Sequence, residues 1–275
     1  MRIKVENYLG QSLELNNNFP VIDVEGLTPA GATINTSTAG LADGTFFNSS
    51  YTNQRNIVLT VIPEGDPEEA RLTLWKYFKP KYKCRLYFRT KTRNVYIDGY
   101  VESIEGTPYS AKASYQISII CPMPFFTDVN PASYDQNFVV DGFTFPVSIP
   151  EEGVVFGNSV RGEGINVYNY GEESTGVVIT LRASGSVVNP RIYNRSNRDL
   201  MGLNISLNAG DTVEIDTRRG YKTIKLNGVN AINSLTSESE WIALDQGENI
   251  FTYTAEYGDF NLDVTYTVYT LYEGL

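Results

Sequence analysis

Apolar residues recur at every second position along several short segments, a pattern typical of half-buried β-strands. In the first half of the chain, this alternation is clear over residues 83–89 and 113–121. Residues 96–105 lie between them, so we expect an antiparallel meander, with a bulge suggested by the Asp-Gly pair at 98–99. Residues 55–62 are almost continuously apolar and β-branched, which predicts a strand covered on both faces.

One segment of the first half instead carries the start and stop signals of a helix. Asp66 is the expected N-cap, Pro67 fits the first helical position, and Glu69 stands where a capping box requires it. Pro80 ends the element. Ala70, Leu74 and Phe78 share one face and are expected in the core, with Trp75 beside them; the alternative for Trp75 is a platform for a ligand.

The second half reads as one short strand after another, with turn residues between them. Such spacing predicts a two-sheet sandwich. The dipeptide Asn227-Gly228 is a strong signal for a two-residue hairpin turn. The expected strands begin near Phe138, Gly164, Gly176, Thr212, Tyr221, Glu248 and Leu262.

Between the two halves, Pro122 and Pro124 cannot continue a paired strand. A polar run from Thr127 then reads as a linker. We therefore expect two domains, over residues 1–128 and 129–275, in a mainly β chain.

Residues 26–54 do not fit this scheme, because they are rich in Gly, Ser, Thr and Asn and have almost no regular apolar pattern. A loop of this length is uncommon within a compact domain. One interpretation is a floppy surface loop, and the other is an arm that becomes ordered against a neighbouring subunit. In the second case Phe46, Phe47 and Tyr51 would anchor the arm as an oligomer interface.

Composition weakens most enzyme hypotheses. The 275 residues include no His, which removes the commonest general base and zinc ligand. Cys84 and Cys121 lie in apolar strands without metal-site spacing and are expected to be buried thiols. Residues 1–125 hold 13 Lys and Arg against 12 Asp and Glu, whereas residues 126–275 hold 9 against 20. The acidic second half disfavours nucleic-acid binding.

Candidate chemistry is sparse. The paired carboxylates Glu151-Glu152 and Glu172-Glu173 could serve glycoside hydrolysis, but adjacent residues in loop-like sequence favour solvated charges. Trp241 is either a core residue or a surface on which a sugar stacks. We expect no catalytic residues, no metal, no other cofactor and no membrane insertion. The first ten residues lack a secretion-signal pattern, so we expect synthesis and folding in the cytoplasm.

Two blocks of the sequence resemble the siphophage distal tail protein family, known for phages of Gram-positive hosts. In the first half, the resemblance lies in the order of features: the Gly-rich arm leading into RNIVLTV, the helix through Trp75, YIDGYVESIE and finally YQISIICPMPFF. In the second half, VEIDTRRGYKTIKLNGVNAI and ALDQGENIFTYTAEYG are similar to the C-terminal sandwich of the family. Residues 138–208 match only in being strand-rich.

The resemblance implies an N-terminal β-rich domain with one helix and a galectin-like or carbohydrate-binding-module-like C-terminal sandwich. It also implies a structural role in the virion, at the tail tip or baseplate. There a hexameric ring would join the tail-tube protein to the tail-associated hub or lysin protein, and in some relatives the outer domains hold receptor-binding proteins. A phage or prophage origin in a Gram-positive bacterium follows from the same resemblance. The alternatives that remain are a module or adhesin for host cell-wall glycans and, third, a glycan hydrolase.

Overall fold

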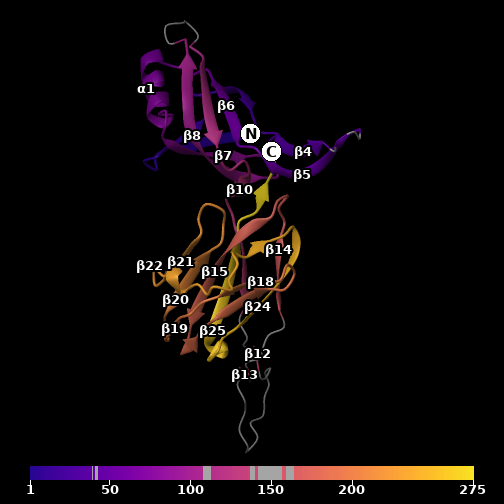
Figure 1. Cartoon of the computed structure of the whole chain (residues 1–275). Helices are drawn as coiled ribbons and strands as arrows, with labels where there is room; N and C mark the ends of the chain where they lie inside the picture. Colours follow the sequence, from indigo (N-terminus) through magenta and orange to yellow (C-terminus); the bar gives the residue numbers. More distant parts are fainter. Residues whose placement is uncertain (39, 41–42, 108–112, 137–139, 142–156, 159–163) are drawn as a thin grey trace, which may run out of the picture. The chain divides into compact units, whose positions relative to one another are not determined.

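The chain forms two compact units in the computed structural model (Figure 1). The first unit comprises Met1–Asn130 and Leu271–Leu275, and the second comprises Pro131–Thr270. The sequence placed this division after residue 128 and assigned the last five residues to the second domain. The structure describes residues 1–38, 40, 43–107, 113–136, 140–141, 157–158 and 164–275.

The first unit is built on one large antiparallel sheet with strand order β2-β1-β7-β8-β9-β6-β3. Two short strands, β10 and β26, extend it beside β8. The strands are β1 (Arg2–Glu6), β2 (Ser12–Leu15), β3 (Val21–Glu25), β6 (Arg55–Val61), β7 (Lys83–Arg89), β8 (Asn94–Gly106), β9 (Tyr115–Cys121), β10 (Phe126–Asp128) and β26 (Leu271–Tyr272). The predicted meander is confirmed, because β7, β8 and β9 pair in sequence order.

Helix α1 (Pro67–Tyr77) covers one face of this sheet and begins where the sequence predicts. The carboxylate of Asp66 accepts hydrogen bonds from the backbone N–H groups of Glu68 and Glu69, each at 2.9 Å. Leu74 is fully buried in the core of the first unit, as predicted. Trp75 is not: it is 46% exposed, because its position on the helix faces away from the sheet. Among the described residues, no helix has both the length and the apolar character needed to cross a membrane.

Two details of the predicted sheet are wrong. The bulge in β8 lies between Val101 and Ser103, and not at Gly99. Gly99 pairs regularly with Cys84, and a side chain at position 99 would collide with Cys121 and its neighbours on β9. The strand β6 has only alternate residues buried, so its outer face is not covered as its apolar sequence suggested.

The second unit is a two-sheet sandwich, as predicted. One sheet has strand order β11-β25-β15-β20-β21-β22 with β23 paired to β15, and the other has order β14-β24-β17-β18. The larger sheet contains β11 (Ala132–Gln136), β15 (Thr175–Ala183), β20 (Thr212–Asp216), β21 (Thr223–Leu226), β22 (Val229–Asn230), β23 (Ala243–Leu244) and β25 (Leu262–Val268). The smaller sheet contains β14 (Ile165–Asn169), β17 (Arg191–Asn194), β18 (Asp199–Gly202) and β24 (Gly247–Thr254). The inner faces share one core, in which the rings of Phe251 and Tyr266 lie 4.6 Å apart.

Smaller elements complete the second unit. The pairs are β12 (Val140–Asp141) with β13 (Gly157–Asn158), and β16 (Val187–Val188) with β19 (Ser206–Leu207). Two short 3-10 turns span Ile232–Ser234 and Asp259–Asn261. The predicted turn at Asn227-Gly228 is confirmed, since both residues have positive φ, at 49° and 81°, between β21 and β22.

The polar run from Thr127 contains the boundary between the two units, after Asn130, but both of its ends form strands. Its beginning forms β10, which pairs with β8, and its end forms β11, which pairs with β25. A polar segment can still form a strand when a partner strand is available, because strand formation depends strongly on the neighbouring strands. The strand expected from Phe138 falls mostly outside the described residues.

Candidate assembly surface

The predicted arm is a β-hairpin that forms a two-stranded sheet of its own. Its strands are β4 (Ala32–Thr38) and β5 (Thr45–Thr52), and a bulge interrupts their pairing between Asn35 and Thr36. The hairpin extends away from the large sheet of the first unit (Figure 1). Isolated two-stranded sheets are only marginally stable in water, so such a hairpin is normally completed by contacts on its faces.

Polar side chains add cross-strand hydrogen bonds to the backbone pairing of the hairpin. Asn35 donates a hydrogen bond to the hydroxyl of Ser49 at 3.0 Å. The hydroxyl of Thr33 donates to the side chain of Asn53 at 2.8 Å. These bonds are consistent with the Ser-, Thr- and Asn-rich composition of the arm, which gave the sequence its loop-like character.

The apolar side chains of the hairpin are exposed. Phe46 and Phe47 are 63% and 66% exposed, and Ile34 and Tyr51 are similarly open to solvent. Because neighbouring strand residues point to opposite faces, Phe46 and Phe47 place an aromatic ring on each side of the hairpin. The three aromatic residues chosen from the sequence are therefore brought together on one element. Such a concentration of exposed apolar groups is typical of an interaction site.

Arg55 fixes the base of the hairpin, a role that the sequence pattern did not indicate. Arg55 is 3% exposed, and its guanidinium donates to backbone carbonyls from three separate segments. The acceptors are the carbonyls of Pro124 at 2.6 Å, Thr28 at 2.6 Å, Gly26 and Glu273. Burial lowers the pKa of Arg55, and attraction to the Cys121 thiol and the Glu273 carboxylate opposes that shift. The signal that could have revealed this role is a charged residue at the start of a buried, apolar strand.

The last residues of the chain also pack against the base of the hairpin. The N–H of Leu275 donates to the carbonyl of Leu27 at 3.0 Å, and Arg93 donates to the carbonyl of Gly274. The ring of Tyr272 lies 4.3 Å from the Arg93 guanidinium. The C-terminal segment and Arg55 thus both bond to residues 26–28 at the base of the hairpin, which we call the hairpin root.

The open face of the large sheet, opposite α1, carries ordered charges and tyrosines. Asp98 accepts hydrogen bonds from Arg85 at 2.6 and 2.9 Å and forms an ion pair with Lys83 at 2.9 Å. Burial alone would raise the pKa of Asp98, but its bonds to Arg85 and Lys83 outweigh that effect and lower it. The ammonium of Lys4 lies 4.1 Å from the centre of the Tyr87 ring. This face is therefore a structured polar surface.

Cys84 and Cys121 are free, buried thiols on the covered face of the same sheet, as predicted. Burial raises the pKa of each thiol to about 12. Within the described parts of the chain, no group of three or more acidic, Cys or His residues could hold a metal ion.

In the second unit, Trp241 is half-buried and packs against the core, with the Lys222 ammonium 5.3 Å from its ring centre. Of the carboxylate pairs, Glu172-Glu173 lies in the turn between β14 and β15, where the carbonyl of Glu173 accepts a hydrogen bond from Asn169. The pair Glu151-Glu152 lies outside the described residues.

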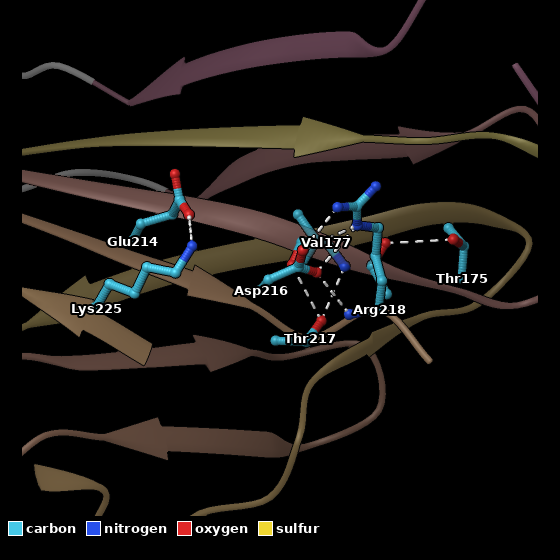
Figure 2. Close-up of polar contacts among 8 residues, drawn as sticks. Thr175, Val177, Glu214, Asp216, Thr217, Arg218 and Lys225 are labelled. Carbon is cyan, nitrogen blue, oxygen red and sulfur yellow. Dashed lines mark hydrogen bonds and ion pairs between the residues drawn. The ribbon is translucent and has the colours of Figure 1, made fainter. Parts of the chain in front are cut away.

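Figure 2 shows a polar corner at the end of β20 in the second unit. The carboxylate of Asp216 pairs with Arg218 at 2.6 Å, and the hydroxyl of Thr217 both accepts from and donates to the backbone of Val177. Gly176 is required here, because a side chain at that position would lie 2.5 Å from the backbone of Arg218. Every one of these contacts is internal to the unit. The corner lies within the VEIDTRRG motif, and its contacts stabilise the fold of the second unit.

Comparison with known proteins finds one matching family model. Residues 170–268 match the family model described as siphovirus-type tail component, C-terminal domain. Comparison with curated proteins finds no significant match.

Solved structures share the fold over nearly the full chain. The crystal structure of SPP1 Dit (gp 19.1), described as a paradigm of the hub adsorption apparatus in Gram-positive infecting phages, has a TM-score of 0.70 at 15% identity. The match covers 97% of this chain and 98% of that one. Chains of the phage P2 baseplate in its activated conformation, with Ca and with Sr, each have a TM-score of 0.55 at 12% and 13% identity. These matches cover 97 to 98% of this chain and 97% of each of those.

The resemblance read from the sequence is confirmed, and the mainly β fold with one described helix is that of the SPP1 Dit structure. The match to the family model lies within the second unit, over residues 170–268.

Proposed function

We propose that this protein is a structural, non-enzymatic component of a phage tail tip that assembles into a ring through its first unit. The observation that carries this proposal is the β4–β5 hairpin, which projects exposed aromatic residues on both faces. The family match of residues 170–268 and the shared fold of a hub protein support the same role.

In this role the ring has six copies and joins the tail-tube protein to the tail-associated hub or lysin protein. Receptor-binding proteins are further candidate partners. The protein is then part of the virion at the tail tip or baseplate, assembled in the host cytoplasm, in a phage or prophage of a Gram-positive bacterium. A closed ring requires one face of a subunit to bind a different face of its neighbour. The hairpin supplies the first of these faces, and the neighbouring first unit receives it.

The aromatic residues provide a measurable share of the association energy. Full burial of a Phe side chain stabilises a contact by about 1.5–3 kcal/mol. Replacing Phe46 and Phe47 together by Ser should therefore weaken association at least about 100-fold, at roughly 1.4 kcal/mol for each factor of ten.

Sedimentation velocity of the full chain over a range of concentrations measures this effect. Phe260→Ser is a matched control, because Phe260 is 64% exposed in the second unit. We expect the hairpin variant to shift towards the monomer, while the control assembles like the original chain. Equal assembly of the two variants would contradict the role of the hairpin.

Glycan recognition by the second unit is a second proposal. Its support is the position of Trp241, which remains partly open beside Lys222. If the ring of Trp241 stacks on a sugar, Trp241→Ala should abolish capture of the chain on host cell-wall polysaccharide. Unchanged capture, or none by the original chain, would remove this proposal.

A further inference from the structure

A hollow of about 530 Å³ lies at one end of the large sheet in the first unit. It is lined by Met1, Arg2, Arg89, Thr90 and Lys91. All three basic side chains are exposed. Together they make this hollow strongly cationic, and we call it the cationic hollow.

The arrangement of these charges is unfavourable for the isolated chain. Arg2 on β1 lies directly opposite Arg89 on β7 in the antiparallel pairing. Like charges in directly opposed positions destabilise a pair of strands. In the described part of the chain, neither arginine makes a hydrogen bond or ion pair through its side chain that would offset this repulsion. A retained cost of this kind points to an anionic group supplied from outside.

An acidic segment lies at the other end of the same sheet. Glu64, Glu68 and Glu69 are exposed around the start of α1, and the Glu68 side chain is 74% exposed even though Arg71 lies 3.7 Å away. We call these three residues the acidic segment. The segment directly follows β6, whose last residue Val61 pairs with Tyr115 on β9.

The pairing register places the two patches beside opposite ends of β8. Arg89 pairs with Asn94, the first residue of β8, whereas Tyr115 pairs with Gly106, the last residue of β8. The loop after β2 nevertheless brings the acidic segment closer, because the N–H of Glu64 donates to the carbonyl of Asn18 at 2.9 Å, three residues after Leu15, which pairs with Ile3 next to Arg2. Within the described residues of one chain, no hydrogen bond or ion pair joins the acidic segment to the cationic hollow.

We infer that the cationic hollow of one copy receives the acidic segment of a second copy in a head-to-tail contact. The inference rests on the proposed ring and specifies one of its contacts. A head-to-tail assembly needs two different, complementary patches on each subunit, and these patches meet that requirement. A nucleic acid is the other polyanion that could occupy the hollow, but a chain with a net charge of −10 repels it at long range.

Charge reversal with compensation tests the contact in the full chain. Arg2→Glu with Arg89→Glu should weaken association at least tenfold, and Glu68→Arg with Glu69→Arg should do the same. A chain carrying all four changes should recover association, because the complementarity is restored with opposite signs. Thermal unfolding of each variant confirms that it is folded. Raising the salt concentration should weaken association of the original chain, because salt screens exposed charges.

Disulfide trapping is an independent measurement that detects the contact even when association is weak, because the cross-link is covalent. A mixture of Arg89→Cys and Glu68→Cys chains should form a cross-linked dimer under mild oxidation. Glu14→Cys is the matched control for the second chain, because Glu14 is an exposed carboxylate elsewhere in the first unit. Its mixture with Arg89→Cys should not cross-link above background.

Three results would overturn the inference. These are unchanged association of both charge-reversal variants, failure of the folded four-fold variant to recover, or equal cross-linking with the control. Loss of duplex DNA binding by the Arg2 and Arg89 variant, with assembly unchanged, would assign the hollow to nucleic acid. If hairpin variants lose assembly while charge-reversal variants keep it, the proposed ring stands and this contact is wrong.

Discussion

Replacing Arg55 by Met tests how the first unit fixes the root of its hairpin. The side chain of Met has a similar length and fits an apolar site, but it donates no hydrogen bonds. The change leaves four backbone carbonyls without their donor: those of Gly26, Thr28, Pro124 and Glu273. Two of these belong to the hairpin root, and one belongs to the returning C-terminal segment.

The expected loss of stability follows from the number of bonds and their charge. Hydrogen bonds that involve a charged group contribute about 1.5–3 kcal/mol each. Removing the buried guanidinium also removes the cost of keeping that charge out of water, so the contributions do not simply add. We expect Arg55→Met to lower the free energy of unfolding of the first unit by about 3–5 kcal/mol. Arg55→Lys should lower it by about 2 kcal/mol, because one ammonium cannot reach all four carbonyls.

Urea unfolding followed by hydrogen exchange separates this effect from the second unit. Exchange should accelerate at Leu275 and Asn53, whose N–H groups bond to Leu27 and Gly31 in and beside the hairpin root. The control is Arg182→Met, because Arg182 is exposed on β15 and its loss should change stability by less than about 0.5 kcal/mol. A change below about 1 kcal/mol for Arg55→Met, with unaltered exchange at both amides, would refute the reasoning.

Three further predictions follow from single groups of the first unit. Asp66→Ala should lower stability by about 1 kcal/mol through loss of the helix cap, measured as a lower urea midpoint; an unchanged midpoint would contradict it. Asp98→Asn should destabilise the unit by about 1–3 kcal/mol at pH 7. Because the pKa of Asp98 is lowered on folding, this difference should persist above about pH 4 and vanish as the pH falls further; a pH-independent difference would be evidence against it. Burial raises the pKa of the Cys84 and Cys121 thiols to about 12. The contribution of the two protonated thiols to the free energy of unfolding is therefore complete below about pH 8.5 and is lost as the pH rises towards 12. At pH 8 iodoacetamide should therefore label them only after unfolding, and labelling of the folded chain at the rate of a free thiol would disprove their burial.

The features that the sequence predicted correctly depend on neighbouring residues. The cap at Asp66 and the turn at Asn227-Gly228 each need only a few adjacent side chains and backbone angles. The meander of β7, β8 and β9 follows from alternation and short turns. Local chemistry of this kind is visible in the order of residues alone.

The features that the sequence missed depend on contacts between distant residues. The segment Leu271–Leu275 returns to the first unit, and its acceptor for Arg55 lies 218 residues away in the sequence. Trp75 was expected in the core because a helical pattern does not say how wide the covered face is. Phe46, Phe47 and Tyr51 were identified because their segment lacked a core pattern, but only the pairing of β4 with β5 shows that they share one hairpin. The like-charge pair of Arg2 and Arg89 likewise depends on strand register.

The ring is tested most directly by native mass spectrometry of the full chain, alone and together with its tail-tube and hub partners. A closed ring of six copies predicts a species of about 180 kDa, six times the chain mass of 30.7 kDa, either free or within the complex with its partners. Replacing Phe46 and Phe47 by Ser should remove that species. A chain that remains at 30.7 kDa under every condition, including with both partners present, would contradict the ring.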